Sequence, residues 1–402
     1  MLSRIVVDEE GQPIIQELSE PAFRGHLERS ANFLRLVKTR DLFEVKPIAP
    51  PRDVVEDCLS LNNWHFPPLR SITEAPMIKS DGSVITTPGY DPSTSFYYSP
   101  AEDLVLPDIP DEPTEDDLKS ATELTLEPLH DFPFDSEASR ANTIATMFTP
   151  ILRPLINGPT PMALFDKPQP GTGASLLANI VSLIATGRNA AMAAPQKDDE
   201  SWRKAITSIL LKGPPLTIFD NIEGVLSSPS LGALLTTTIW SDRILGKNCW
   251  VNLPNYCIWI GTGNNIQLAG DLPRRCFWIR MDAETPRPWL RERNQFQHPE
   301  LGRWIIENRG RLLASMFTIA KGWIMSGKPK WQGQNIGMYE GWCEVVGGIM
   351  SYMGVDGFLE NLDLMYDKMD QGTLKWELFL TIWHQEIGTE AITTRKLGDI
   401  VK

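Results

Sequence analysis

A glycine-rich loop between an apolar run and a helical stretch is the first feature of the chain that could do chemistry. The segment MALFDKPQPGTGASLLANIVSLIATG, residues 162–187, has the order strand, loop, helix. In phosphate-binding loops the amides of such a turn and of the helix N-terminus surround phosphate oxygens. We therefore predict that Gly171, Thr172 and Gly173 form a phosphate cradle, and that the Ser175 hydroxyl binds Mg²⁺.

One position of this loop departs from the usual pattern. Such loops carry a lysine before the serine, as a point charge against the β- and γ-phosphates of ATP, whereas this chain has Ala174. The amides and Mg²⁺ are still expected to hold nucleotide, but hydrolysis should be severely impaired. Two explanations stay open. One is an engineered Lys→Ala change that traps a nucleotide-bound state, which we prefer; the other is a natural variant in which another cation, such as Lys167, substitutes.

A second apolar run, PPLTIFDNIE at residues 214–223, ends in an acid. Its Asp220 is predicted to complete the Mg²⁺ site, as the acid at the end of a Walker B strand does. Asn221 stands where a second acid is usual, so the general base that polarises water is left open. Glu223 is the nearest candidate for that base.

The third apolar run, IWIGTGNN at residues 258–265, ends in polar side chains. In ATPases of the AAA+ class, which this order of motifs resembles, a polar residue here is called sensor 1. It sits between the two Walker strands and orients the attacking water. Asn264 is the preferred candidate, with Asn265 and Thr262 as alternatives.

Two adjacent arginines, Arg274 and Arg275, precede the fourth apolar run in DLPRRCFWIRMD. In AAA+ rings this position faces the nucleotide of the neighbouring subunit as an arginine finger. A fixed guanidinium there stabilises charge on the transferred phosphoryl group. The competing interpretation is a surface arginine pair that caps a strand.

A hairpin is predicted between the second and third apolar runs, in TTTIWSDRILGKNCWVNLPN at residues 236–255. Its arms RIL and CWVNL flank a Gly-Lys-Asn turn, and Lys247 lies at the tip. This insertion resembles the pore hairpin of superfamily 3 and MCM-like helicases, in which a basic tip contacts DNA phosphates. Lys247 and Asn248 are therefore the predicted DNA-binding residues. A solvated turn with an incidental lysine is the alternative.

Composition limits the class of protein. The chain has 402 residues, 42% of them hydrophobic and 22% charged, so it can bury sizeable cores. Five cysteines and five histidines are scattered without metal-ligand spacing, which favours reduced thiols over a zinc site. The net charge of −13 argues against a uniformly basic surface, although a ring can concentrate a few cations in a pore. No apolar run reaches membrane-spanning length and no signal peptide is visible, so we expect a soluble, cytoplasmic protein.

The elements that must position these motifs form an α/β fold. Apolar runs without alternation indicate buried parallel strands, and interleaved helical stretches imply a covered sheet. We predict helices over 21–45 and 53–61, a hairpin turn at Asp81-Gly82 and a second turn at Asp91-Pro92. Further helices are predicted from Thr114, over 136–153, over 301–326 and over 338–353.

Five regions follow from this pattern. They are a small mixed α+β N-terminal accessory or collar domain (1–98), an acidic proline-rich linker with a helix (99–135), an AAA+ ATPase core (136–286), a helical lid region (287–372) and the start of a C-terminal helical unit (373–402). A DNA-binding winged helix would be expected near the end of the chain, so the abrupt end suggests a shortened form.

Taken together, the motifs resemble one family. The runs GTGASLLANIVSLIATGR, FDNIEGVLSSPSLGALLT, SDRILGK, GTGNN and DLPRR are similar to the helicase-like ATPase module found downstream of primase-polymerase domains in phages, plasmids and integrative elements. SDGSVITTPGYDPSTSFYY, DFPFDSEASRAN, RPWLRERNQF and WCEVVGGIM extend the resemblance over nearly the whole chain. It implies a homo-oligomeric ring, usually a hexamer, that couples hydrolysis of ATP with Mg²⁺ to movement on single-stranded or forked DNA.

The predicted function is therefore an ATP-dependent DNA helicase or translocase subunit that replicates a mobile genetic element, hydrolysis-impaired because of Ala174. No primase motif is visible, so a primase-polymerase would be a separate partner. The first alternative is a nucleotide-binding scaffold or loader that does not hydrolyse ATP. A remodeller of proteins ranks lower, because its pore loop should carry an aromatic-apolar pair rather than Gly-Lys-Asn.

Overall fold

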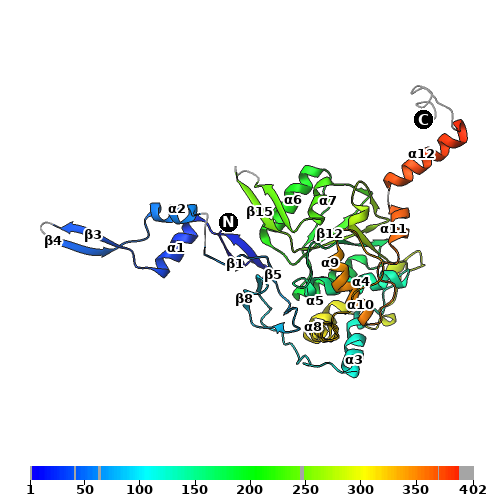
Figure 1. Ribbon diagram of the computed structural model, residues 1–402, viewed down its shortest axis with the longest axis horizontal. Helices are drawn as coiled ribbons and strands as arrows, with labels where there is room; N and C mark the ends of the chain where they lie inside the picture. Colours follow the sequence, from blue (N-terminus) through cyan, green and yellow to red (C-terminus); the bar gives the residue numbers. More distant parts are fainter. Residues whose placement is uncertain (1, 40–41, 62–64, 245–248, 370, 389–402) are drawn as a thin grey trace. The chain divides into compact units, whose positions relative to one another are not determined.

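The computed structural model describes residues 2–39, 42–61, 65–244, 249–369 and 371–388 (Figure 1). Contacts between residues divide the chain into two compact units. The smaller unit comprises Met1–Leu69 and Leu211–Gly213, and the larger comprises Arg70–Leu210 and Pro214–Lys402. The chain therefore divides by contacts near residue 70, and the functional division at residue 98 stays a prediction.

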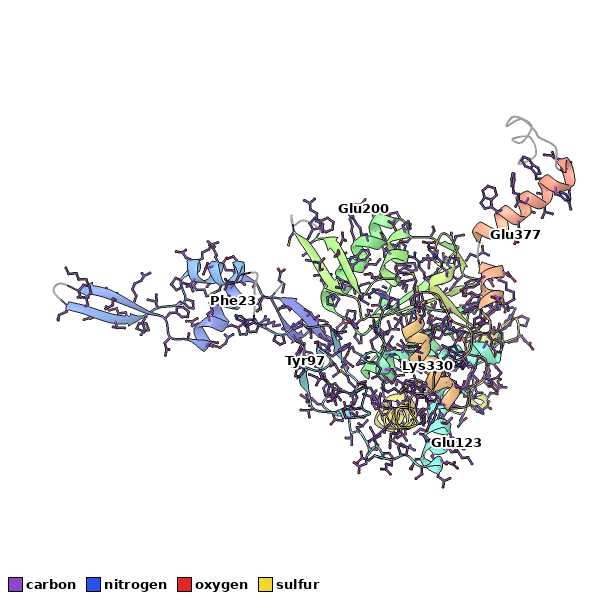
Figure 2. All side chains as sticks on the ribbon, in the orientation of Figure 1. Phe23, Tyr97, Glu123, Glu200, Lys330 and Glu377 are labelled. Carbon is purple, nitrogen blue, oxygen red and sulfur yellow. The ribbon has the colours of Figure 1, made fainter. Side chains whose placement is uncertain are left out.

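The smaller unit contains two hairpins and two helices. Strand β1 (Ser3–Val7) pairs antiparallel with β2 (Pro13–Glu17), and β3 (Leu34–Thr39) pairs antiparallel with β4 (Leu42–Pro47). Phe23 is the buried residue of α1 (Glu20–Ser30), and its place is labelled in Figure 2. Val55 is the buried residue of α2 (Arg52–Ser60), so the helix predicted over 53–61 is confirmed within one residue at either end.

The helix predicted over 21–45 is wrong in its second half. Helix α1 ends at Ser30, and the following residues form the β3–β4 hairpin. Leu34 and Leu36 alternate with polar residues, and this period of two suits a strand. Leu34 and Leu36 lie in β3 and pair with Pro47 and Val45 of β4. Cross-strand pairing thus outweighed a spacing that also fits a helix.

The larger unit is built on a five-stranded parallel sheet with the order β11–β12–β16–β10–β18. These strands are β11 (Met192–Ala193), β12 (Leu216–Ile222), β16 (Ile258–Asn264), β10 (Met162–Lys167) and β18 (Cys276–Arg280). The four apolar runs predicted as buried parallel strands are therefore confirmed. The third run, β16, lies between β10 and β12, as predicted.

Helices flank this sheet (Figure 1). Helix α5 (Ala174–Thr186) follows β10, and all of its residues except Ser175 and Leu176 are buried. Four other helices accompany the sheet: α4 (Glu137–Leu152), α6 (Asp199–Lys212), α7 (Pro229–Leu235) and α8 (Leu301–Met325). The predicted helices 136–153 and 301–326 are confirmed. Ser136 caps α4 by accepting a hydrogen bond from the amide of Ser139.

Short strands precede the sheet in the chain. Strands β6 (Met77–Ile78) and β7 (Val84–Ile85) pair antiparallel around the predicted Asp81-Gly82 turn. Strands β8 (Gly89–Asp91) and β9 (Phe96–Tyr98) pair antiparallel around the second predicted turn, and β5 (Ser71–Thr73) joins β9 in parallel. Both predicted turns are therefore confirmed. Two further short strands, β13 (Val225–Leu226) and β17 (Gln267–Leu268), form a parallel pair beside the main sheet.

Helix α3 (Glu115–Leu126) begins after Thr114, the predicted cap, whose side chain and that of Asp117 form a reciprocal capping box. The region after residue 287 is helical, as expected. Its elements are 3₁₀ turns at Pro288–Leu290 and Arg293–Gln295, α8, α9 (Glu340–Trp342), a π-helical turn (Cys343–Gly347), α10 (Gly348–Tyr352), α11 (Leu362–Met369) and α12 (Gln371–Ile387). In the described residues, no helix combines the length and the apolar character needed to cross a membrane.

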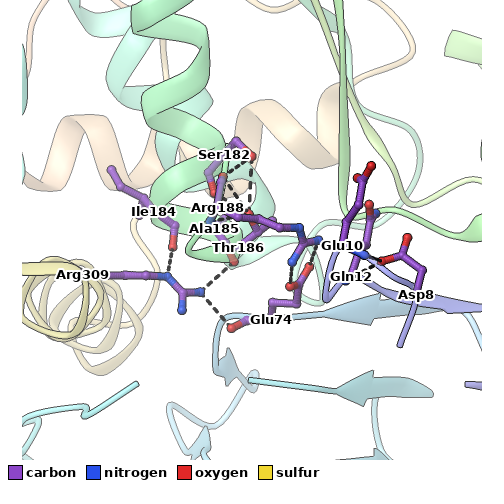
Figure 3. Close-up of polar contacts among 10 residues, drawn as sticks. All are labelled: Asp8, Glu10, Gln12, Glu74, Ser182, Ile184, Ala185, Thr186, Arg188 and Arg309. Atoms are coloured by element: carbon purple, nitrogen blue, oxygen red, sulfur yellow. Dashed lines mark hydrogen bonds and ion pairs between the residues drawn. The ribbon is translucent and has the colours of Figure 1, made fainter. Parts of the chain in front are cut away.

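A buried arginine joins α8 to the C-terminal end of α5 (Figure 3). Arg309 is 4% exposed and donates to the carbonyl oxygens of Ile184 (2.9 Å), Ala185 (3.1 Å) and Glu74 (2.9 Å). Burial lowers the pKa of Arg309 to about 10, so the group stays a cation at neutral pH. The Glu74 carboxylate forms a bidentate ion pair with Arg188, which follows α5. These contacts fix the helix that begins at the glycine-rich loop.

We expect Arg309→Met to lower the free energy of unfolding by about 3 kcal/mol, because three buried carbonyls lose their donor. The matched control is Arg303→Met on the same helix. Arg303 is an exposed partner of Glu307, and its loss should cost less than about 0.5 kcal/mol. Denaturant unfolding of both variants measures the difference. Equal midpoints would show that α5 does not depend on this guanidinium.

Candidate functional site

The glycine-rich loop joins the end of β10 to the start of α5. Gly171 and Gly173 have φ angles of 81° and 102°, in the left-handed region that favours glycine. Gly173 is the N-cap of α5, and Thr172 donates its hydroxyl hydrogen to the Gln169 carbonyl at 2.8 Å. Ala174 is the first residue of α5 and is fully buried. The predicted cradle thus lies at the N-terminus of a long buried helix, where backbone amides favour anions.

Two hydroxyl groups converge on one carboxylate beside this loop. The Ser175 Oγ donates to Asp220 Oδ1 at 2.7 Å, and the Thr262 Oγ1 donates to the same oxygen at 2.5 Å. The three residues come from α5, β12 and β16. The structure therefore brings together the two predicted Mg²⁺ ligands, and it adds Thr262, which was one of the alternatives for sensor 1.

An irregularity in β12 sets the direction of the Asp220 side chain. The register between β12 and β16 shifts between Phe219 and Ile222, so Asp220 and Asn221 form a bulge. Asn221 has a φ of 60°, and its amide donates to Thr262 Oγ1 at 3.2 Å. Bulges of this kind redirect a side chain near functional sites. The Thr262 hydroxyl thus ties both residues of the bulge to the neighbouring strand.

The donor set suits Mg²⁺ with a phosphate ligand. In the described part of the chain, no group of three or more His, Cys, Asp or Glu residues could hold a metal ion. Mg²⁺ commonly takes one or two protein oxygens and completes its octahedron with phosphate oxygens and water. Asp220 and Ser175 supply one carboxylate and one hydroxyl at the mouth of the glycine-rich loop. The residues present therefore fit a Mg²⁺–nucleotide complex better than an all-protein metal site.

The other polar residues predicted at the strand ends lie close by. Glu223 is exposed, and its Oε1 accepts a hydrogen bond from Asn221 Nδ2 at 2.8 Å. The Asn264 Oδ1 is buried and has no hydrogen-bond partner in the described residues. Asn265 donates its amide hydrogen to the Lys167 carbonyl at 3.0 Å, which fixes the entry to the loop. A buried acceptor without a protein donor at this edge is free to accept a hydrogen bond from a bound molecule.

The two predicted finger arginines have different surroundings. Both form ion pairs with Asp271, at 2.9 Å from Arg274 and 2.7 Å from Arg275. The Arg274 side chain is 64% exposed, whereas that of Arg275 is 12% exposed and packs against Gly232. Neither forms a hydrogen bond or an ion pair with Asp220 in the described residues. The exposure favours Arg274 as the group that could reach a neighbouring molecule.

The predicted hairpin is present, and its first arm begins earlier than expected. Strand β14 (Ile239–Arg243) pairs antiparallel with β15 (Trp250–Pro254). Asp242 accepts a hydrogen bond from Thr207 of α6 at 2.6 Å, which anchors the buried face. Trp250 is 72% exposed on the opposite face, with Arg243 as its cross-strand neighbour. The predicted DNA-binding residues Lys247 and Asn248 lie outside the described residues.

A cavity of about 1200 Å³ opens beside the loop, and no residue of its outer wall was predicted to have a role. Gly171–Gly173 form one wall, and residues 283–303 with 130–133 form the others. The outer wall, which residues 283–303 form, carries the cations Arg287, Arg291 and Arg303. The spacing of arginines in RPWLRERNQF is the only signal in the sequence that points to it. An elongated anion bound at the loop would extend into this basic cavity.

A buried carboxylate supports the end of β10. Asp166 is 1% exposed and accepts hydrogen bonds from the Ile266 amide at 2.9 Å and from Arg280 Nη1 at 2.6 Å. Burial raises the pKa of Asp166, and the bonded amide and guanidinium oppose that rise. The pair fixes β10 against β18 next to the loop. Asp166 belongs to the framework of the site, and no pattern in the sequence singles it out.

The cysteines of the chain are free, and three of them, Cys257, Cys276 and Cys343, are buried. Burial raises the pKa of the Cys257 thiol to about 12 and that of Cys343 to about 11. These thiols are therefore poor nucleophiles at neutral pH.

Comparison of the chain with models of protein families finds no match, and neither does comparison with curated proteins. A proposal for the function of the chain therefore rests on the fold, the geometry of the site and the resemblance in the motifs. What the fold defines is an α/β protein with a parallel sheet flanked by helices, compatible with a phosphate-loop core.

Proposed function

We propose that the chain is a P-loop ATPase of the AAA+ type that acts as an ATP-dependent DNA helicase or translocase subunit in the replication of a mobile genetic element. The observation that carries the proposal is the convergence of the Ser175 and Thr262 hydroxyls on Asp220 beside the glycine-rich loop. The strand order supports it, because β16 places Asn264 between the loop strand and the strand of Asp220. Ligands of parallel sheets bind at this carboxyl edge.

The roles of the residues follow from their positions. The amides of residues 171–175 hold the phosphates, and Ser175 and Asp220 hold Mg²⁺. When bound, Mg²⁺ neutralises negative charge on the phosphate oxygens. Glu223, oriented by Asn221, is the proposed base for water, and Asn264 orients that water with its buried oxygen. The basic cavity beside the loop takes the remainder of the nucleotide.

DNA is the proposed polymer substrate. The β14–β15 hairpin presents Trp250 on its exposed face, and the sequence between its two strands includes Lys247. Exposed aromatic rings stack on bases and cations contact phosphates, so this combination suits single-stranded DNA. A homo-oligomeric ring, usually of six subunits, would gather these hairpins around one strand. A cytoplasmic location and a separate primase-polymerase belong to the same proposal.

The test is ATP hydrolysis with and without single-stranded DNA, measured for this chain and for Ala174→Lys. We expect Ala174→Lys to hydrolyse ATP faster than the parent chain, and DNA to stimulate that activity, because the added lysine supplies charge to the β- and γ-phosphates. Because Ala174 is fully buried, the melting temperature of the variant must be recorded as well.

A second candidate is a nucleotide-binding scaffold or loader that does not hydrolyse ATP. The buried Ala174 in the lysine position favours it. If both chains fold and bind ATP but neither turns it over, the motor proposal fails and the scaffold remains. Turnover that protein substrates stimulate and DNA does not would instead support a protein remodeller.

A further inference from the structure

Lys167 is the last residue of β10, immediately before the glycine-rich loop. Its position in the sheet is fixed on both sides. It pairs with Asn264 of β16 in the parallel register, and its carbonyl accepts a hydrogen bond from the Asn265 amide at 3.0 Å. The residue is half-buried. Lys167 therefore stands on a rigid strand end, directly before the loop, and not on a loose loop.

The surroundings of the ammonium group are acidic. Partial burial lowers the pKa of Lys167, and the carboxylates of Asp220 and Asp166, which lie in electrostatic range, oppose that shift by favouring the charged form. Within the described residues its ammonium group forms no hydrogen bond and no ion pair within 4 Å. The neighbouring cation Arg280 is already committed to Asp166 at 2.6 Å. A half-buried ammonium without a direct partner is costly, and a phosphate oxygen would relieve that cost.

We propose that Lys167 binds the terminal phosphates of the nucleotide from the end of β10 and so replaces the charge that a lysine at position 174 would supply from the start of α5. This inference rests on the proposed function, and it names the residue that makes the loop competent without its usual lysine. It favours the second explanation of Ala174, a natural variant in which another cation substitutes. A chain that carries such a cation has no need of a lysine in the loop to bind ATP.

The experiment is calorimetric titration of the full chain and its variants with Mg·ATP, Mg·ADP and adenosine. We expect Lys167→Met to weaken binding of Mg·ATP by about 10- to 100-fold, the size of a lost charge-assisted hydrogen bond. Binding of Mg·ADP should weaken less and binding of adenosine should not change, because the lost contact is to the terminal phosphates.

Lys167→Arg should retain most of the affinity. The control is Lys204→Met on α6, which removes the same charge from a surface pair with Glu200 and should leave all three affinities unchanged.

The double variant Lys167→Met with Ala174→Lys separates charge from structure. If Lys167 supplies phosphate charge, a lysine restored at position 174 should recover Mg·ATP affinity to within a few fold of the parent chain. An unchanged Mg·ATP affinity in Lys167→Met overturns the inference and leaves the proposed function standing. Equal losses for ATP, ADP and adenosine also overturn it, because they indicate a structural role. A parent chain that binds no Mg·ATP refutes the proposed function, and the inference falls with it.

Discussion

Replacing Asp220 with asparagine is expected to abolish Mg²⁺-dependent binding of ATP by this chain. Asp220 is the carboxylate on which the Ser175 and Thr262 hydroxyls converge, at 2.7 Å and 2.5 Å. Loss of a group that merely orients a metal ligand costs about 10- to 100-fold in affinity, and a direct carboxylate ligand should cost at least as much. Titration of ATP at low and high Mg²⁺ measures this, since the variant should lose the gain in affinity that Mg²⁺ gives the parent chain.

Two further variants make this prediction specific. Thr262→Val removes only the hydroxyl that orients Asp220 and should cause a smaller loss of affinity, about 10-fold. Glu223→Gln should leave Mg²⁺-dependent binding intact, because Glu223 is exposed and bonds only Asn221 among the described residues, and it should reduce turnover, because Glu223 is the proposed base. If Asp220→Asn binds Mg·ATP as the parent chain does, the metal site has been assigned to the wrong residues.

The sequence was sufficient to predict four strands of the sheet and the proximity of Ser175 to Asp220. Buried parallel strands lack the alternation of half-exposed strands, so β10, β12, β16 and β18 are visible as apolar runs that end in polar residues. Since the carboxyl ends of parallel strands meet at one edge, Asp220 and the loop that carries Ser175 had to lie together. Their contact at 2.7 Å is what that reasoning predicts.

The finer geometry of the site depends on register and could not be predicted. Thr262, Asn264 and Asn265 were the candidates for sensor 1. Which of these side chains faces Asp220 depends on the bulge in β12. A bulge inserts one residue on one strand, and composition alone does not locate it. The structure gives different contacts to all three, because Thr262 bonds Asp220, Asn264 keeps an unpaired buried oxygen and Asn265 holds the loop.

Two other features lay beyond pattern reasoning for different reasons. Residues 283–303 line the cavity as irregular chain with 3₁₀ turns, so they carry no periodicity that would mark them. The helix predicted over 21–45 failed because Leu36 fits both the helical spacing and the alternation of a strand, and pairing with the adjacent strand β4 decided between them.

The arginine pair shows the same limit and leads to the prediction with the largest effect. Arg274 and Arg275 are identical in type and adjacent in sequence, yet their exposed fractions are 64% and 12%. The 3₁₀ turn at Pro273–Arg275 sends one guanidinium to solvent and the other against Gly232. A residue that acts on a neighbouring subunit must be accessible, so Arg274 is the group expected to act in trans.

Arg274→Ala is expected to lower ATP turnover by about 10³-fold or more without weakening ATP binding, the size of effect that arginine fingers have. The measurement uses the Ala174→Lys background, in which we expect turnover to be strongest. The matched control is Arg275→Lys, which should lower the melting temperature, because it alters a buried guanidinium, and should leave a measurable rate.

Mixing two inactive chains tests whether Arg274 acts between subunits. In a mixed oligomer of Arg274→Ala and Asp220→Asn subunits, the first kind retains an intact metal site and the second retains the arginine. Wherever an Arg274→Ala site faces the arginine of an Asp220→Asn neighbour, a complete site forms, so part of the activity should return on mixing. If the mixture instead stays inactive although the two chains assemble together, Arg274 does not act in trans. In that case the proposal of a ring whose subunits share each ATP site must be abandoned.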